Sequence, residues 1–111
     1  MAILEKKSLS KPEQYQEYEK GKAEVVMAGG LTFARITTEP GWKWSKHQKP
    51  LEKTESCIKA HLLYMVSGKL HVRMDDGKEE EFGAGDIAVI PPGHDVWTAG
   101  DEPAVVLEIS H

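Results

Sequence analysis

The chain has 111 residues, of which 40% are apolar and 29% are charged, a balance typical of one globular domain and unlike that of disordered, collagen-like or coiled-coil chains. Its longest uncharged apolar runs fall far short of the ~20 residues that a membrane helix needs, so no membrane association is expected. Lys and Arg number 14 against 18 Asp and Glu, a net charge of −4, and because the basic residues are scattered among acidic ones, nucleic acid is not an expected partner.

The first twenty residues carry the pattern of a short helix. Ser10 and Glu13 have the S-x-x-E spacing of a capping box, and Gly21 stands where a left-handed residue would end a helix. A helix is therefore predicted over about residues 11–20. Charged residues near the start of the chain occupy the place where a secretory signal would have its apolar region, which predicts a cytoplasmic protein.

From about residue 22 onward the pattern is that of an all-β domain. Short runs rich in Val, Ile, Leu and aromatic residues alternate with Gly, Pro and Asp, which is typical of a sandwich or barrel. The predicted strands cover residues 23–28, 31–38, 42–47, 57–66, 69–74, 79–82, 87–90, 96–99 and 104–109, and no second helix is predicted. We expect a double-sheet jelly-roll barrel over about residues 22–110, with a central pocket, in a single domain spanning 1–111.

The five histidines differ in what their neighbours imply. His111 ends the chain, where fraying is expected. His71 alternates with apolar residues along a predicted strand, which places it on the opposite, solvent-facing side. His61 shares the face of an apolar strand, where it is either a core histidine bonded to a backbone carbonyl or a ligand. His47 follows a run with two tryptophans, and His94 follows a Pro-Pro-Gly turn, so that neither is decisive alone.

Cys57 is the one cysteine of the chain, so it cannot form an internal disulfide and is either a small buried group or a functional thiol. Cys57 and His61 would lie on the same face of a regular strand, with Cα atoms about 13 Å apart at ~3.3 Å per residue. A shared metal ion could not bridge that span. Joint ligation by these two residues therefore requires a bulge or bend at residues 58–60.

Three segments together resemble the two signature motifs of the cupin superfamily. They are Gly41-x5-His47, His61-x6-Gly68 and Gly85-Asp86-x4-Pro91-Pro92-Gly93-His94. The resemblance covers about residues 31–109, and the chain as a whole resembles a small single-domain bacterial cupin. Within it, His61 stands at the position that is usually glutamate, and Cys57 stands where the second histidine of the first motif would fall. His94 lies two places before the histidine of the second motif, and about seven extra residues, 49–55, lengthen the loop before Cys57.

The resemblance implies a metal centre inside the barrel. Its implied ligands are His47, Cys57, His61 and His94. Imidazole and thiolate suit a divalent transition metal such as zinc, iron, nickel or copper, whereas the absence of a matched carboxylate argues against magnesium or calcium.

Three functions remain open from the sequence. The first is a metal-dependent enzyme that acts on a small organic molecule in the pocket, and the second is a non-catalytic cupin that binds or senses a small molecule or a metal. In the third, Cys57 is a nucleophile paired with His61 or His47, although no Asp or Asn spacing supplies a third member. A homodimer is also predicted, because a barrel of this size has edge strands to cover.

Overall fold

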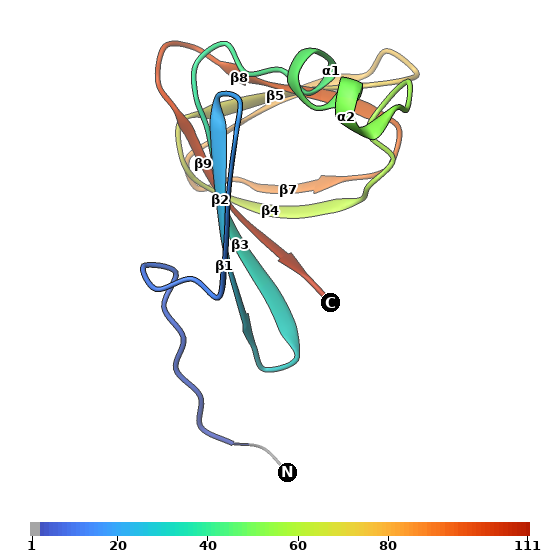
Figure 1. The fold of residues 1–111 in the computed structure, drawn as a ribbon. Coiled ribbons are helices and arrows are strands. Elements are labelled where there is room, and N and C mark those ends of the chain that lie inside the picture. Colours follow the sequence, from blue (N-terminus) through green and yellow to red (C-terminus); the bar gives the residue numbers. More distant parts are fainter. Residues whose placement is uncertain (1–2) are drawn as a thin grey trace.

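A computed structural model describes residues 3–111 and shows two antiparallel sheets facing each other across one core (Figure 1). One sheet has six strands in the order β1-β2-β3-β9-β4-β7, and the other has three in the order β6-β5-β8. The strands are β1 (Gln14–Tyr18), β2 (Gly21–Ala28), β3 (Leu31–Thr38), β4 (His61–Ser67), β5 (Lys69–Met74), β6 (Glu79–Gly83), β7 (Ile87–Ile90), β8 (His94–Ala99) and β9 (Ala104–Ser110). Met1 and Ala2, which the predicted domain 1–111 includes, lie outside the described residues.

The alternation of buried and exposed residues explains the double sheet. In β8 every second residue, starting at His94, faces the interior, and β5 buries Leu70 and Val72 in the same way. These rows meet the buried residues of β4, among them Met65, which is fully buried. Burying one face of each sheet against the other removes both apolar rows from water, and the predicted all-β jelly-roll fold is confirmed.

The predicted helix over residues 11–20 is wrong, because Gln14–Tyr18 forms strand β1 instead. This strand pairs with β2 through a two-residue turn at Glu19 and Lys20, where Lys20 has a φ of 60°. The capping-box residues have other partners: the Ser10 hydroxyl bonds to that of Ser8, and Glu13 accepts the Met27 N–H. Cross-strand pairing has therefore overridden a local helix signal.

The second difference lies at residues 42–47, where a strand was predicted and no second helix was expected. Lys43 forms one bridge to Trp97, after which the chain turns into two short helices, α1 (Trp44–His47) and α2 (Lys49–Glu52). Trp44 remains buried in this conformation and donates its Nε1–H to Glu52 at 3.0 Å. The helices cover one side of the barrel beside β8 (Figure 1), and α2 falls within the loop extension at residues 49–55.

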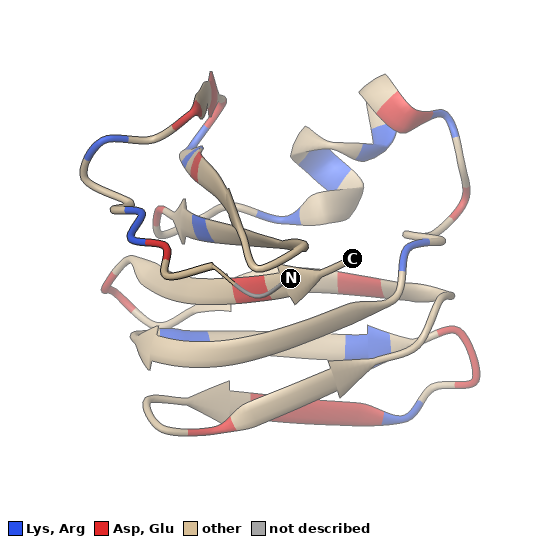
Figure 2. Cartoon of the chain, turned by 90° about the horizontal axis from the view of Figure 1, so that it is seen from below, with Lys and Arg blue, Asp and Glu red and all other residues tan. Residues whose placement is uncertain are grey.

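Strands β1, β2 and β3 extend beyond the barrel as an arm, and the chain before β1 runs past the end of that arm (Figure 1). The molecule has one long dimension of 45 Å against 29 and 26 Å. Basic and acidic residues are interspersed along the strands and loops (Figure 2), as the sequence pattern predicted. Within residues 3–111, none of the helices has the length and apolar character needed to cross a bilayer.

Candidate metal centre

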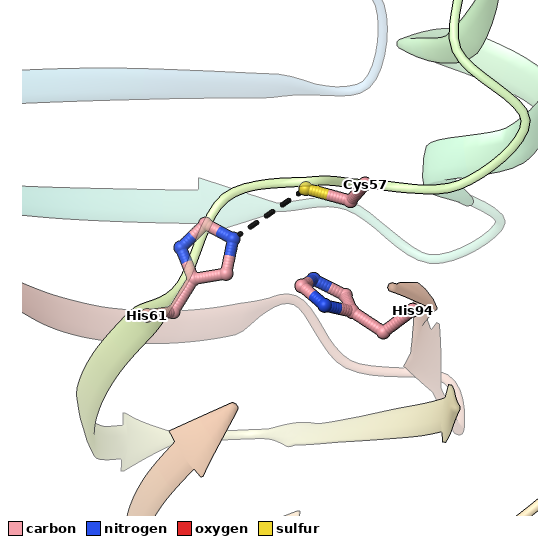
Figure 3. A group of neighbouring side chains, drawn as sticks. All are labelled: Cys57, His61 and His94. Atoms are coloured by element: carbon pink, nitrogen blue, oxygen red, sulfur yellow. Dashed lines mark hydrogen bonds between the residues drawn. The ribbon is translucent and has the colours of Figure 1, made fainter. Parts of the chain in front are cut away.

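Three of the predicted ligands converge inside the barrel (Figure 3): Cys57, His61 and His94. Cys57 precedes β4, His61 is the first residue of β4, and His94 is the first residue of β8. One donor atom from each lies within 4.8 Å of the other two. The closest pair is Cys57 Sγ and His61 Nε2, 3.6 Å apart, while the two imidazole rings meet edge to face with centroids separated by 5.2 Å.

The backbone around Cys57 makes this convergence possible. Residues 58–60 are not part of a strand, since β4 begins only at His61, so the chain has the bend that joint ligation requires. Cys57 is held against β8, because its N–H donates to the His94 carbonyl at 2.8 Å and its own carbonyl accepts the Gly93 N–H at 2.7 Å. Gly93 has a φ of 90°, a conformation that glycine adopts without steric cost. The Pro-Pro-Gly turn thus places His94 beside the thiol.

His94 is oriented as a metal ligand would be. Its side chain is fully buried, and its Nδ1 lies 2.8 Å from the Pro91 carbonyl oxygen. A carbonyl can only accept, so Nδ1 carries a proton, and in the neutral imidazole Nε2 then has a free lone pair. Within the described part of the chain, that Nε2 is buried without a hydrogen-bond partner. A buried acceptor is rarely left unsatisfied unless something else completes its environment.

His61 is fixed from its other side by Glu108 of β9. Its Nδ1 lies 2.5 Å from Glu108 Oε2, which leaves Nε2 to face Cys57. A carboxylate behind the imidazole is the usual support for a metal-binding histidine. Sequence reasoning missed Glu108, although Glu108 shares the parity of the buried residues Ala104 and Val106 along the predicted strand. The sequence signal that could have identified Glu108 is an acidic residue at an inward-facing position of a strand.

The three groups also alter one another's protonation. Burial raises the pKa of the Cys57 thiol, but the hydrogen bond from His61, the nearby imidazole of His94 and the backbone of residue 59 outweigh it and lower the pKa to about 6. Burial lowers the pKa of His61, but hydrogen bonds to Cys57 and Glu108 outweigh it and raise the pKa to about 9. At neutral pH the pair is therefore a thiolate and an imidazolium; the thiolate is the form that binds metal, and His61 would release its Nε2 proton on binding one.

The structure does not bring His47 into this group. The short helix α1 turns its side chain elsewhere, where Nδ1 accepts the backbone N–H of Lys43 at 3.1 Å and Nε2 lies 3.7 Å from a carboxylate oxygen of Glu19. His71 lies on the outer side of β5, stacked on Trp97, and His111 is exposed at the chain end.

The donor set fits a divalent transition metal. With Zn–S of ~2.3 Å and Zn–N of ~2.0 Å, tetrahedral ligands lie about 3.5 Å apart, close to the 3.6 Å between Cys57 Sγ and His61 Nε2. The 4.8 Å limit leaves about 1 Å to be closed by small side-chain rotations. One thiolate and two imidazoles suit zinc, iron or copper, and three protein ligands leave a further coordination position.

A cavity of about 80 Å³ adjoins this centre inside the barrel. His61, His94 and Glu108 line it together with Thr38, Trp42 and apolar side chains of both sheets. A ligand in the cavity would therefore contact the imidazoles that could hold a metal.

Solved structures with a similar fold include complete small proteins and parts of larger enzymes. A protein of unknown function from Rhizobium leguminosarum bv. viciae 3841 is 18% identical, with a TM-score of 0.71, and the alignment covers 99% of this chain and 98% of that one. Lactobacillus farciminis oxalate decarboxylase, in a formate complex, is 25% identical, with a TM-score of 0.61 over 87% of this chain and 30% of the enzyme.

A variant of Bacillus subtilis oxalate decarboxylase is 28% identical, with a TM-score of 0.60 over 92% of this chain and 28% of the enzyme. The chain thus spans less than a third of the length of these decarboxylases. A comparison with curated proteins found no match. The family model described as "Cupin domain" matches residues 34–110, and the chain therefore belongs to the cupin family.

Proposed function

We propose that the protein is a metal-dependent enzyme that acts on a small organic molecule in the barrel cavity, with a divalent transition metal held by Cys57, His61 and His94. The observation that carries the proposal is the buried Nε2 of His94, which has no partner among the described residues and lies within 4.8 Å of the other two donor atoms. A metal ion would satisfy this lone pair and, when bound, would act as a Lewis acid on ligand oxygen atoms.

Two features favour catalysis over simple metal storage. Three protein ligands leave a coordination position open, as catalytic sites do and structural sites do not, and His61 and His94 both border the cavity. The similarity to oxalate decarboxylases, at 25–28% identity over part of their length, is consistent with a compact acid as substrate.

The chain's own residues have separable roles in this proposal. Glu108 holds the proton of His61 Nδ1 and so keeps Nε2 directed at the metal position, and the Pro91 carbonyl does the same for His94. The low exposure of Cys57, 4%, keeps water from the thiolate, which strengthens its attraction to a cation.

Metal content of variants purified without a histidine tag tests the proposal. Cys57→Ser, His61→Ala and His94→Ala should each lose most of the metal that the unaltered protein retains, because each removes one of three ligands. His47→Ala and His71→Ala are matched controls outside the group and should retain it. Metal-free unaltered protein, after growth and dialysis with zinc, iron or copper present, would contradict the proposal, and so would equal loss in the control variants.

A non-catalytic cupin that binds or senses a ligand on the same centre is the alternative. It shares the metal site and differs only in turnover, so metal content does not separate the two. Incubation of the metal-loaded protein with compact carboxylic acids, followed by product analysis, does. Ligand binding without any product would favour the alternative.

A second candidate function uses Cys57 as a nucleophile, and one observation supports it. Glu108 completes a thiol–imidazole–carboxylate series with Cys57 and His61, the third member that the sequence pattern lacked. Alkylation of metal-free protein at neutral pH tests this candidate. A thiol that resists the reagent until the protein is denatured would end it.

We further propose a cytoplasmic homodimer. Large apolar side chains are exposed on the outer side of β4 and the edge strand β7, and these are Leu62, Tyr64, Val66, Ile87 and Val89. Covering such a stripe with a second copy would remove it from water. Sedimentation equilibrium checks the oligomeric state, and a monomer at high protein concentration would contradict the homodimer.

A further inference from the structure

Trp42 has a buried hydrogen-bond donor that the described chain does not satisfy. Its side chain is 7% exposed, and among residues 3–111 its Nε1–H has no acceptor. The neighbouring indole of Trp44, in contrast, donates to Glu52 at 3.0 Å. Buried indole N–H groups normally donate a hydrogen bond, and a buried donor without an acceptor destabilises the fold. The acceptor for Trp42 must therefore come from outside the described chain.

Thr38 supplies a second donor at the same place. Its hydroxyl lies 2.8 Å from that of Thr98 and accepts the Thr98 proton, so its own proton remains available, since two hydroxyls that share one bond use only one of their two protons. Trp42 is tied to the same strand, because its carbonyl accepts the Thr98 N–H at 3.0 Å. Thr38 and Trp42 both line the cavity of about 80 Å³.

The rest of the cavity lining defines what a ligand there could be. His61 and His94, which would bind the metal, form part of the lining. The carboxylate of Glu108 is hydrogen-bonded to His61. Apart from Trp42 and Thr38, the remaining lining side chains are apolar. No Lys or Arg occurs in this lining within the described residues. The cavity thus offers two neutral donors, on Trp42 and Thr38, opposite the imidazoles that would bind the metal and the carboxylate of Glu108. Its volume of about 80 Å³ is roughly five to eight times the ~10–15 Å³ that one water needs, so only a small ligand fits.

We propose that Trp42 and Thr38 form a ligand subsite that binds the acceptor oxygens of a compact carboxylate lying between these donors and the metal centre. This inference rests on the proposed function, because the cavity has no Lys or Arg, and once His61 and His94 are neutral metal ligands only the metal ion supplies the positive charge that a carboxylate needs. Trp42 and Thr38 would then favour ligands that carry an acceptor oxygen beside them, since a ligand without one leaves both buried donors unpaired.

Acetate binding to the Co²⁺-loaded protein, followed by its visible absorption, tests the subsite. The unaltered protein should show a saturable spectral change. Trp42→Phe and Thr38→Val should each weaken acetate binding about three- to tenfold, the effect of losing one hydrogen bond to a ligand. Trp97→Phe and Thr37→Val are the matched controls outside the cavity lining and should bind acetate as the unaltered protein does. Cobalt content is measured for every sample.

The outcomes separate the subsite from the metal centre. If cobalt is retained but acetate causes no spectral change, or binds the cavity variants and their controls equally well, the subsite inference is overturned and the metal centre stands. If the unaltered protein takes up no cobalt, the proposed function fails and the inference fails with it. Should Trp42→Phe not fold, the comparison of Thr38→Val with Thr37→Val decides alone.

Discussion

Glu108 and His61 form a hydrogen-bonded pair that is more buried than a surface ion pair. Their side chains are 20% and 19% exposed, and the carboxylate accepts from His61 Nδ1, on the side of the ring away from Cys57. Such a partner fixes the tautomer and the ring orientation of a metal-binding histidine and raises its basicity. In the proposed metal centre, Glu108 would therefore contribute to metal affinity more than to folding.

Glu108→Gln should weaken zinc affinity about 10- to 100-fold, the usual cost of losing a carboxylate behind a metal-binding histidine. Competition with a chromophoric chelator measures the affinity. Glu79→Gln is the matched control, because Glu79 accepts from His71 at 2.7 Å on the outer surface. Equal zinc affinity in both variants would show that Glu108 does not support a metal ligand.

At the residue scale, the sequence predicted a cysteine and histidines for the candidate centre but not their full arrangement. Cys57, His61 and His94 converge because the chain bends at residues 58–60 and the turn ending at Gly93 brings β8 alongside. His47 was expected with them from motif spacing, but α1 turns it away. Glu108 was missed because its partner lies 47 residues away in the sequence, and local patterns do not reveal such contacts.

At the scale of elements, strands were predictable where alternation and turn residues agreed. The ranges predicted for β3, β5 and β7 coincide with the observed strands. The helix prediction for the N-terminal segment failed because its capping-box spacing is a local signal, whereas β1 is stabilised by pairing along its whole length with β2. Non-local pairing overrides helix propensity in such short segments.

The β2–β3 hairpin carries an ion pair whose effect on stability depends on pH. Arg35 donates to both carboxylate oxygens of Glu24, from Nε at 3.0 Å and from Nη2 at 2.9 Å, and this bond lowers the pKa of Glu24 below its ordinary value of 4.5. A lowered pKa in the folded state means that the stabilisation is present above the ordinary value and is lost as pH falls through the lowered one.

Arg35→Met should therefore reduce the free energy of unfolding by about 0.5 kcal/mol at neutral pH, a small value because the pair is partly exposed. The difference from the unaltered protein should vanish in acid, below the lowered pKa of Glu24. Urea unfolding at both pH values measures it. Arg73→Met is the control, since Arg73 forms no ion pair within residues 3–111. A difference that persists in acid would contradict an electrostatic origin.

For the whole molecule, the candidate centre lies where the two sheets meet. His61 belongs to the six-stranded sheet and His94 to the three-stranded sheet, while Cys57 bridges to β8 through its backbone. A metal ion held by all three would cross-link the sheets of the barrel. Because it would bind the folded chain and not the unfolded one, it would also stabilise the fold.

Zinc should accordingly raise the thermal midpoint. A free concentration one hundred times the dissociation constant adds about 2.7 kcal/mol, which corresponds to about 10 °C or more for a domain of this size. Differential scanning calorimetry with and without zinc measures the shift. The His94→Ala variant should show no comparable response, and a shift of equal size in that variant would place the zinc elsewhere.

X-ray absorption at the metal edge of the zinc-loaded protein tests the central claim most directly, because it counts the ligand atoms. The account predicts one sulfur at about 2.3 Å and two imidazole nitrogens at about 2.0 Å, with the sulfur contribution lost in Cys57→Ser and unchanged in His47→Ala. A spectrum of the unaltered protein with only nitrogen and oxygen neighbours would contradict it.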